Sequence, residues 1–129
     1  MKTLRFAFIA KNLSGGGAEK VLLETASLLQ QQGHRVLVLT LGNVVEHMLP
    51  KNLKIQHLNV LNGLTKALGR QTWVNQWQAQ RVQQALDVFQ ADAVISCNAE
   101  YVSRFVRHAH LYHWVHGVIT GSKPRVMAD

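Results

Sequence analysis

The residues with the clearest potential for chemistry are three consecutive glycines and a histidine near the carboxyl end. Gly15, Gly16 and Gly17 stand between an apolar run and a helix-type pattern, and His116 follows a later apolar run. Glycines at such a turn let a ligand approach the backbone closely, and free amides at a helix start attract an anion such as phosphate. A tight strand-to-helix turn would also explain the glycines, and a surface strand end would explain the histidine.

Two well-known phosphate-binding loops are excluded by the residues that follow the glycines. In a nicotinamide dinucleotide site, a third glycine would stand where this chain has Lys20, and an acidic residue would end the next strand, where it has Thr40-Leu41-Gly42-Asn43. A nucleoside-triphosphatase loop would need Gly-Lys-Ser/Thr after the glycines, and that sequence is absent. The sequence therefore predicts no nicotinamide cofactor and no loop of the triphosphatase kind.

The remaining candidate ligands are histidines near the carboxyl end and a single cysteine. Four histidines crowd the last quarter of the chain: His108, His110, His113 and His116. Alternation along a strand would point His113 and His116 to opposite faces, and His108 and His110 would diverge at a helix end. We therefore expect no metal site. Cys97 ends an apolar run, and we expect it to be a buried, unreactive thiol.

The elements that must position these residues alternate between strand and helix patterns. We expect strands at 4–10, 36–39, 53–58, 92–97 and 111–115, helices at 18–32, 70–90 and 100–110, a loop at 59–69, and little signal from 117 onward. Such alternation predicts a doubly wound, parallel, Rossmann-like α/β sheet of strand order 3-2-1-4-5. Ligands of such sheets bind at the carboxyl ends of the strands, near the switch between the first and fourth strands. Here that edge would hold 14–19, 98–100 and 116–117.

Composition indicates one domain, residues 1–129, in a reducing compartment. The chain is 47% apolar, has one cysteine, and contains no run of the roughly 20 apolar residues that span a bilayer. Its first strand-like run lacks the cleavage site of a signal peptide. We expect a cytoplasmic protein, which could also attach to the inner face of the membrane.

The charge of the chain limits its partners. The net charge is +7, and between Glu46 and Asp87 there is no acidic residue, whereas five basic ones occur there: Lys51, Lys54, Lys66, Arg70 and Arg81. This segment could face anionic lipid, at about 1 kcal/mol for each basic residue, or could be a solvated surface. Trp73 and Trp77, one helical turn apart, could pack under the sheet or face the same membrane. Nucleic acid is disfavoured because the basic residues are scattered singly.

Two stretches of the chain resemble a known enzyme family. The run SGGGAEKVLLETASLLQQQGHRVLVLTL, 14–41, resembles the opening of family 4 glycosyltransferases, which are two-domain GT-B enzymes with a Gly-Gly-Ala-Glu loop and a Gly-His before the second strand. The run ADAVISCNAEYVSRFVRHAHLYHWVHG, 91–117, resembles the strand–helix–strand segment of that family, which ends in a His-Gly-like turn. The resemblance covers most of the chain in element order, and the first stretch is the more specific.

The resemblance implies transfer of a sugar from a nucleotide-sugar donor to a saccharide or lipid-linked acceptor, usually with retention and without a metal. It implies that the amino-terminal domain supplies the acceptor side. Gly15, Gly16 and Gly17 would then lie against the donor phosphates or sugar, and His116 would hydrogen-bond the reacting sugar or its developing charge. Glu19 and Lys20 are expected to be surface residues at the helix start.

The resemblance also implies a second Rossmann-like domain that grips the nucleotide, and the sequence does not contain one. We therefore expect an incomplete GT-B amino-terminal domain without turnover of its own. The edge of the fifth strand would be exposed, which would favour self-association. Two alternatives remain: a non-catalytic GT-B-derived binding module, and half of a sugar-nucleotide epimerase, for which the expected additional acidic and histidine residues are absent.

Overall fold

The computed structural model describes residues 3–13, 17–61, 63–68, 71–115 and 118–121. They form one six-stranded sheet in the order β3-β2-β1-β4-β5-β6. The strands are β1 (Arg5–Ala10), β2 (Arg35–Thr40), β3 (Lys54–His57), β4 (Ala93–Cys97), β5 (Leu111–Val115) and β6 (Val118–Gly121). The first five are parallel, so the predicted Rossmann-like order 3-2-1-4-5 is confirmed.

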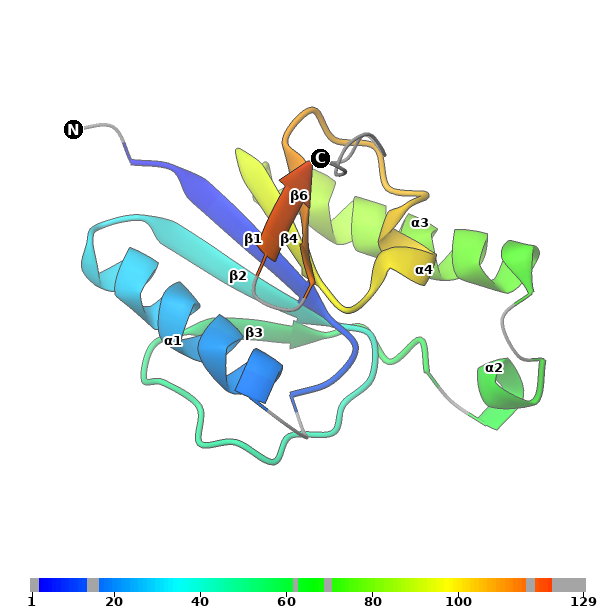
Figure 1. The fold of residues 1–129 in the computed structure, drawn as a ribbon. Coiled ribbons are helices and arrows are strands. Elements are labelled where there is room, and N and C mark those ends of the chain that lie inside the picture. Colours follow the sequence, from blue (N-terminus) through cyan, green and yellow to red (C-terminus); the bar gives the residue numbers. More distant parts are fainter. Residues whose placement is uncertain (1–2, 14–16, 62, 69–70, 116–117, 122–129) are drawn as a thin grey trace.

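The helices are α1 (Gly17–Gln31), α2 (Gly63–Leu68), α3 (Thr72–Phe89) and α4 (Glu100–Ser103). Helix α1 covers one face of this sheet and α3 and α4 cover the other, while α2 lies apart from both faces (Figure 1). Alternate residues of the central strands, being turned to opposite sides, pack against different helices. Phe8 and Val38 belong to the cluster that includes α1, whereas Ala7, Ile9 and Leu37 belong to the cluster that includes α3 and α4.

The first helix ends as its sequence indicates. Gly33 has a φ of 97°, a left-handed conformation that side chains rarely adopt, and its N–H bonds to the carbonyl of Gln30 at 3.0 Å. His34 then accepts a hydrogen bond through Nδ1 from the backbone N–H of Leu4, at 3.1 Å, and its ring meets Phe6 edge-on. The turn after α1 is thus joined to the start of β1.

The helix predicted over 100–110 is wrong beyond Ser103. The amides of Phe105 and Val106 bond three residues back, as in a tightening last turn, and the N–H of Arg107 bonds instead to Oε1 of Gln83, at 2.8 Å. Gln83 also donates from Nε2 to the carbonyl of Arg107, at 3.1 Å. A side chain of α3 therefore takes the backbone groups that would continue α4.

Two further elements differ from the expectation. Residues 63–68, predicted as loop, form α2, which is under two turns long and too short to show a helical period. Residues 118–121, which carry little signal, form β6 and pair antiparallel with β5, Val115 opposite Val118. The prediction that β5 has an exposed edge is therefore wrong, because β6 occupies that edge.

Candidate functional site

The carboxyl ends of the central strands lie level with one another. The register pairs Ala10 of β1 with Cys97 of β4, and Cys97 with Trp114 of β5. From this edge α1 leaves to one face of the sheet and α4 to the other, which makes the β1–β4 boundary the switch point where ligands of such sheets bind. Asn98, just past β4, has a φ of 56°, a left-handed conformation that asparagine tolerates better than most residues.

The predicted site residues are only partly within the described chain. Gly17 is the first residue of α1, and a Cβ added there would meet no heavy atom within 4 Å. The space beside this helix start is therefore open to a ligand. Gly15, Gly16 and His116 lie outside the described residues. The proximity of His116 to the glycine turn therefore stays a prediction.

Glu19 acts on the sheet end and not only on the solvent. The Cys97 thiol is buried, and burial raises its pKa to about 12, with the negative charge of Glu19 as the second cause. Glu19 is in the first turn of α1, the helix that packs beside β4. Sequence reasoning placed Glu19 on the surface, and it is half-buried. A carboxylate here can accept hydrogen bonds from ligand hydroxyls.

The ends of β2 and β3 carry a linked threonine and histidine. Thr40 is fully buried, and its hydroxyl donates to the carbonyl of Gly42 at 2.8 Å. The same oxygen lies 2.5 Å from Nδ1 of His57, and because the hydroxyl hydrogen is already used, Nδ1 must be the donor. No sequence pattern singles out His57, because only the pairing of β2 with β3 brings it next to Thr40.

The backbone that enters the glycine turn is fixed by the loop after β2. Asn12 accepts a hydrogen bond through Oδ1 from the N–H of Val44, at 3.1 Å. Leu13 is fully buried, and its N–H bonds to the carbonyl of Val44 at 3.0 Å while its carbonyl accepts from Glu46 at 2.9 Å. The chain is therefore held in place up to the residue before the glycine-containing turn.

Substitution of Gly42 tests whether Asn12 holds the loop after β2 in this way. A Cβ on Gly42 would overlap Oδ1 of Asn12, so Gly42→Ala should displace Asn12 from Val44 and lower the free energy of unfolding by about 1–3 kcal/mol. After Asn12→Ala the obstacle is gone, and the same glycine change should cost less than about 0.5 kcal/mol. Urea denaturation of the four chains measures this coupling. An equal cost in both backgrounds would show that the two residues do not meet.

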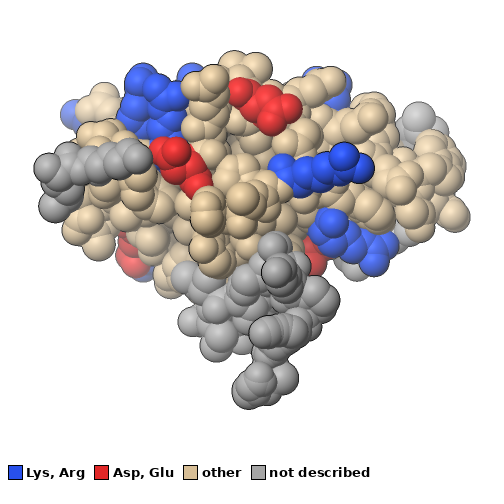
Figure 2. All heavy atoms as spheres, turned by 90° about the horizontal axis from the view of Figure 1, so that it is seen from above, with Lys and Arg blue, Asp and Glu red and all other residues tan. Residues whose placement is uncertain are grey.

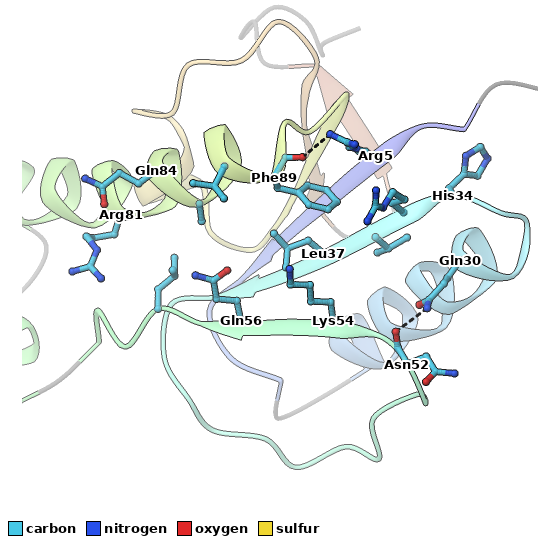
Figure 3. Close-up of a pocket in the computed structure, with 15 residues that line it drawn as sticks. Arg5, Gln30, His34, Leu37, Asn52, Lys54, Gln56, Arg81, Gln84 and Phe89 are labelled. Carbon is cyan, nitrogen blue, oxygen red and sulfur yellow. Dashed lines mark hydrogen bonds between the residues drawn. The ribbon is translucent and has the colours of Figure 1, made fainter.

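Two hollows lined by described residues lie away from the carboxyl edge. A groove of about 680 Å³ runs beside α3 over the starts of β2 and β3, and its wall includes Arg35, Lys54 and Arg81 (Figure 3). A second hollow, of about 730 Å³, lies between α1 and the loop at 47–50. Neither includes Gly17 or Asn98.

The ring of His108 has a structural partner at each nitrogen. Nδ1 of His108 accepts from the N–H of His110 at 3.0 Å, and its Nε2 lies 2.8 Å from the carbonyl of Ala91, to which it must donate. Within the described residues, no three histidine, cysteine, aspartate or glutamate side chains gather as a metal site would require. His108 serves to join β4 and β5 where both begin.

The strand order identifies the fold, and comparison with known proteins identifies no family. The sheet is of the Rossmann-like α/β class. No protein-family model matches the chain, and no curated protein matches it. None of the helices in the described residues is long and apolar enough to cross a membrane.

Proposed function

We propose that this chain is the amino-terminal, acceptor-side domain of a GT-B glycosyltransferase. In this proposal it works with a second α/β domain that binds the nucleotide-sugar donor. The observation that carries the proposal is the switch point. There, the open helix start at Gly17 and the end of β4 meet at one edge, level with the end of β5. The similarity of 14–41 and 91–117 to family 4 glycosyltransferases supports the same assignment.

The residues at this edge have distinct proposed roles. Backbone amides of Gly15, Gly16 and Gly17 would bind the donor diphosphate, aided by the dipole of α1. His116 would hydrogen-bond the reacting sugar and stabilise charge as the glycosidic bond to the diphosphate breaks. Glu19, half-buried in the first turn of α1, would accept a hydrogen bond from a sugar hydroxyl. The acceptor hydroxyl would enter from the same open edge.

Amide chemical shifts of the ¹⁵N-labelled chain test the proposal. Addition of UDP, GDP, UDP-glucose or GDP-mannose should shift the amides of Gly17, Glu19 and Asn98, with an affinity of roughly millimolar or weaker because the donor domain is absent. No glycosyl transfer by the isolated chain is expected. Shifts confined to the groove beside α3, or none at all, would contradict the assignment, and any product would contradict the need for a second domain.

A charge change at Gly17 provides a matched control. Aspartate is favourable in the first turn of a helix, and space is open there, so Gly17→Asp should remain folded. Its negative charge should weaken diphosphate binding about fivefold, the effect of one like charge at about 4 Å in water. Gly17→Asn has nearly the same shape without the charge and should change the affinity little. Equal affinities for the two variants would place the diphosphate elsewhere.

A further inference from the structure

One side of α3 exposes two tryptophans in line with a cation. The outer stripe of α3 consists of Trp73, Trp77, Arg81, Gln84 and Val88, which fall within about 80° of arc at 3.6 residues per turn. All five are exposed, including Trp73 at 59%, Trp77 at 40% and Val88 at 87%. Large apolar side chains exposed in one line usually mark an interaction surface. The sequence left two possibilities for these tryptophans, packing under the sheet or facing a membrane. The exposure of both side chains excludes the first.

The groove beside this stripe is basic. Register pairs Arg5 of β1 with Arg35 of β2, and Leu37 of β2 with Lys54 of β3, so these cations share the sheet face that α3 covers. Across the groove stands Arg81 of α3 (Figure 3). Of the described residues that line the groove, none is acidic. Its base is apolar, formed by Leu37 and other buried side chains.

Two carboxylates near the groove have hydrogen-bond partners, and one of them, Asp92, lines a small hollow together with Arg5 and Arg35. Asp87 of α3 accepts a hydrogen bond from Gln83, on the side of the helix away from the groove, at 3.1 Å. Asp92, beside Arg5, accepts from the N–H of Arg5 at 2.8 Å. Figure 2, which views the molecule from above, shows lysine and arginine on that face in separate groups, with aspartate and glutamate among them. Arg5 and Arg35 lie opposite each other on neighbouring strands, so their positive charges repel one another.

We propose that the outer stripe of α3 and the adjoining basic groove dock on an anionic lipid bilayer. Tryptophan rings have their preferred position at the level of lipid headgroups, where the apolar ring is sheltered and the indole N–H stays hydrated. Lysine and arginine within a Debye length of the surface are attracted by the headgroup charge. Lys54 and Arg81 are exposed and flank the groove, so lipid phosphates can reach both. The net charge of +7 adds long-range attraction of the same sign.

Docking in this way would bring the candidate site to the membrane. Because α3 follows β3 and leads back to the start of β4, its tryptophan end lies toward the carboxyl edge of the sheet. The open edge with Gly17 would then lie near the bilayer, where a lipid-linked acceptor would be found. This last step rests on the proposed function, whereas the docking itself does not.

Flotation with vesicles tests the docking. The chain should float with vesicles of 70% phosphatidylcholine and 30% phosphatidylglycerol, and should not float with phosphatidylcholine alone. Trp73→Ala/Trp77→Ala should lower the partition coefficient at least tenfold, since both rings leave the interface. The control Leu28→Ala/Met48→Ala removes two exposed apolar side chains from other surfaces and should change it less than threefold.

The charge contribution has its own pair of variants. Lys54→Gln/Arg81→Gln should lower binding to the anionic vesicles roughly 30-fold. Lys11→Gln/Lys20→Gln makes the same change in net charge outside the groove and should lower it less than fivefold. Circular dichroism of every variant should match the parent chain. Equal losses for groove and control pairs, binding to neutral vesicles, or no binding at all would overturn the proposal. The last outcome would point to a protein partner for the stripe. The nucleotide titration contains no lipid, so a negative flotation result would not change its interpretation.

Discussion

Phe8→Ala is expected to lower the free energy of unfolding by about 3–5 kcal/mol, the usual cost of removing a fully buried phenyl ring. Phe8 lies in the middle of β1, the central strand, and is 0% exposed. Its ring packs in the cluster formed with α1, which includes Leu22, Leu23 and Ala26. The loss would consume much of the 5–15 kcal/mol typical of a domain, so the variant should unfold at a far lower urea concentration.

The control for Phe8 is an apolar residue on the surface. Val88 is exposed on α3, and Val88→Ala should change the free energy of unfolding by no more than about 0.5 kcal/mol. If Phe8→Ala does not fold, Phe8→Leu gives a smaller cavity and a measurable transition. A loss for Phe8 no larger than that for Val88 would mean that the α1 face of the sheet is not packed as described.

The second large effect is a loss of stability at alkaline pH that depends on Cys97. Its thiol is buried, and burial, with the charge of Glu19 as a smaller cause, raises its pKa from 9.0 to about 12. Between these two pH values the unfolded chain has lost the thiol proton and the folded chain has kept it. Rising pH therefore favours unfolding, by about 1.4 kcal/mol for each pH unit above 9, or roughly 2 kcal/mol by pH 10.5.

Cys97→Ala isolates this contribution, because the other groups that titrate at alkaline pH remain. The free energy of unfolding, measured in urea from pH 8 to pH 10.5, should fall more steeply for the parent chain than for the variant. The stability from the protonated thiol is complete below pH 9, so the two slopes should agree there. Parallel curves up to pH 10.5 would show that the thiol is accessible to solvent and that its pKa is ordinary.

The order of the sheet was predictable because its central strands are local patterns. Residues 4–10, 36–39 and 92–97 are short, largely apolar runs, as buried parallel strands are, and the handedness of crossover connections leaves few arrangements for them. β6 was not predictable, because its four residues form a strand only by pairing with β5. The early end of α4 depends on Gln83, 24 residues before Arg107, and no local signal reports such a contact.

The sequence could predict which edge of the sheet holds the candidate site, but not the contacts between the residues at that edge. The glycines and the strand ends indicated the carboxyl edge, and the level alignment of Ala10, Cys97 and Trp114 agrees with it. The position of Glu19 depends on how α1 is rotated above the sheet, which the sequence pattern fixes only coarsely. The apolar residues of α1 show this, since Val21 and Leu28 are exposed while Leu22, Leu23 and Ala26 are buried.

The proposed function requires the glycine turn and His116 to share one crevice, and a spin label tests this. In a Cys97→Ala chain, a nitroxide on Gly16→Cys should strongly broaden the His116 amide, because β1 and β5 are two strand spacings apart, about 10 Å. A label on Gln31→Cys, at the far end of α1, should broaden Gly33 and leave His116 sharp. A sharp His116 signal with the label at position 16 would contradict the shared crevice, and the sugar-transfer assignment with it.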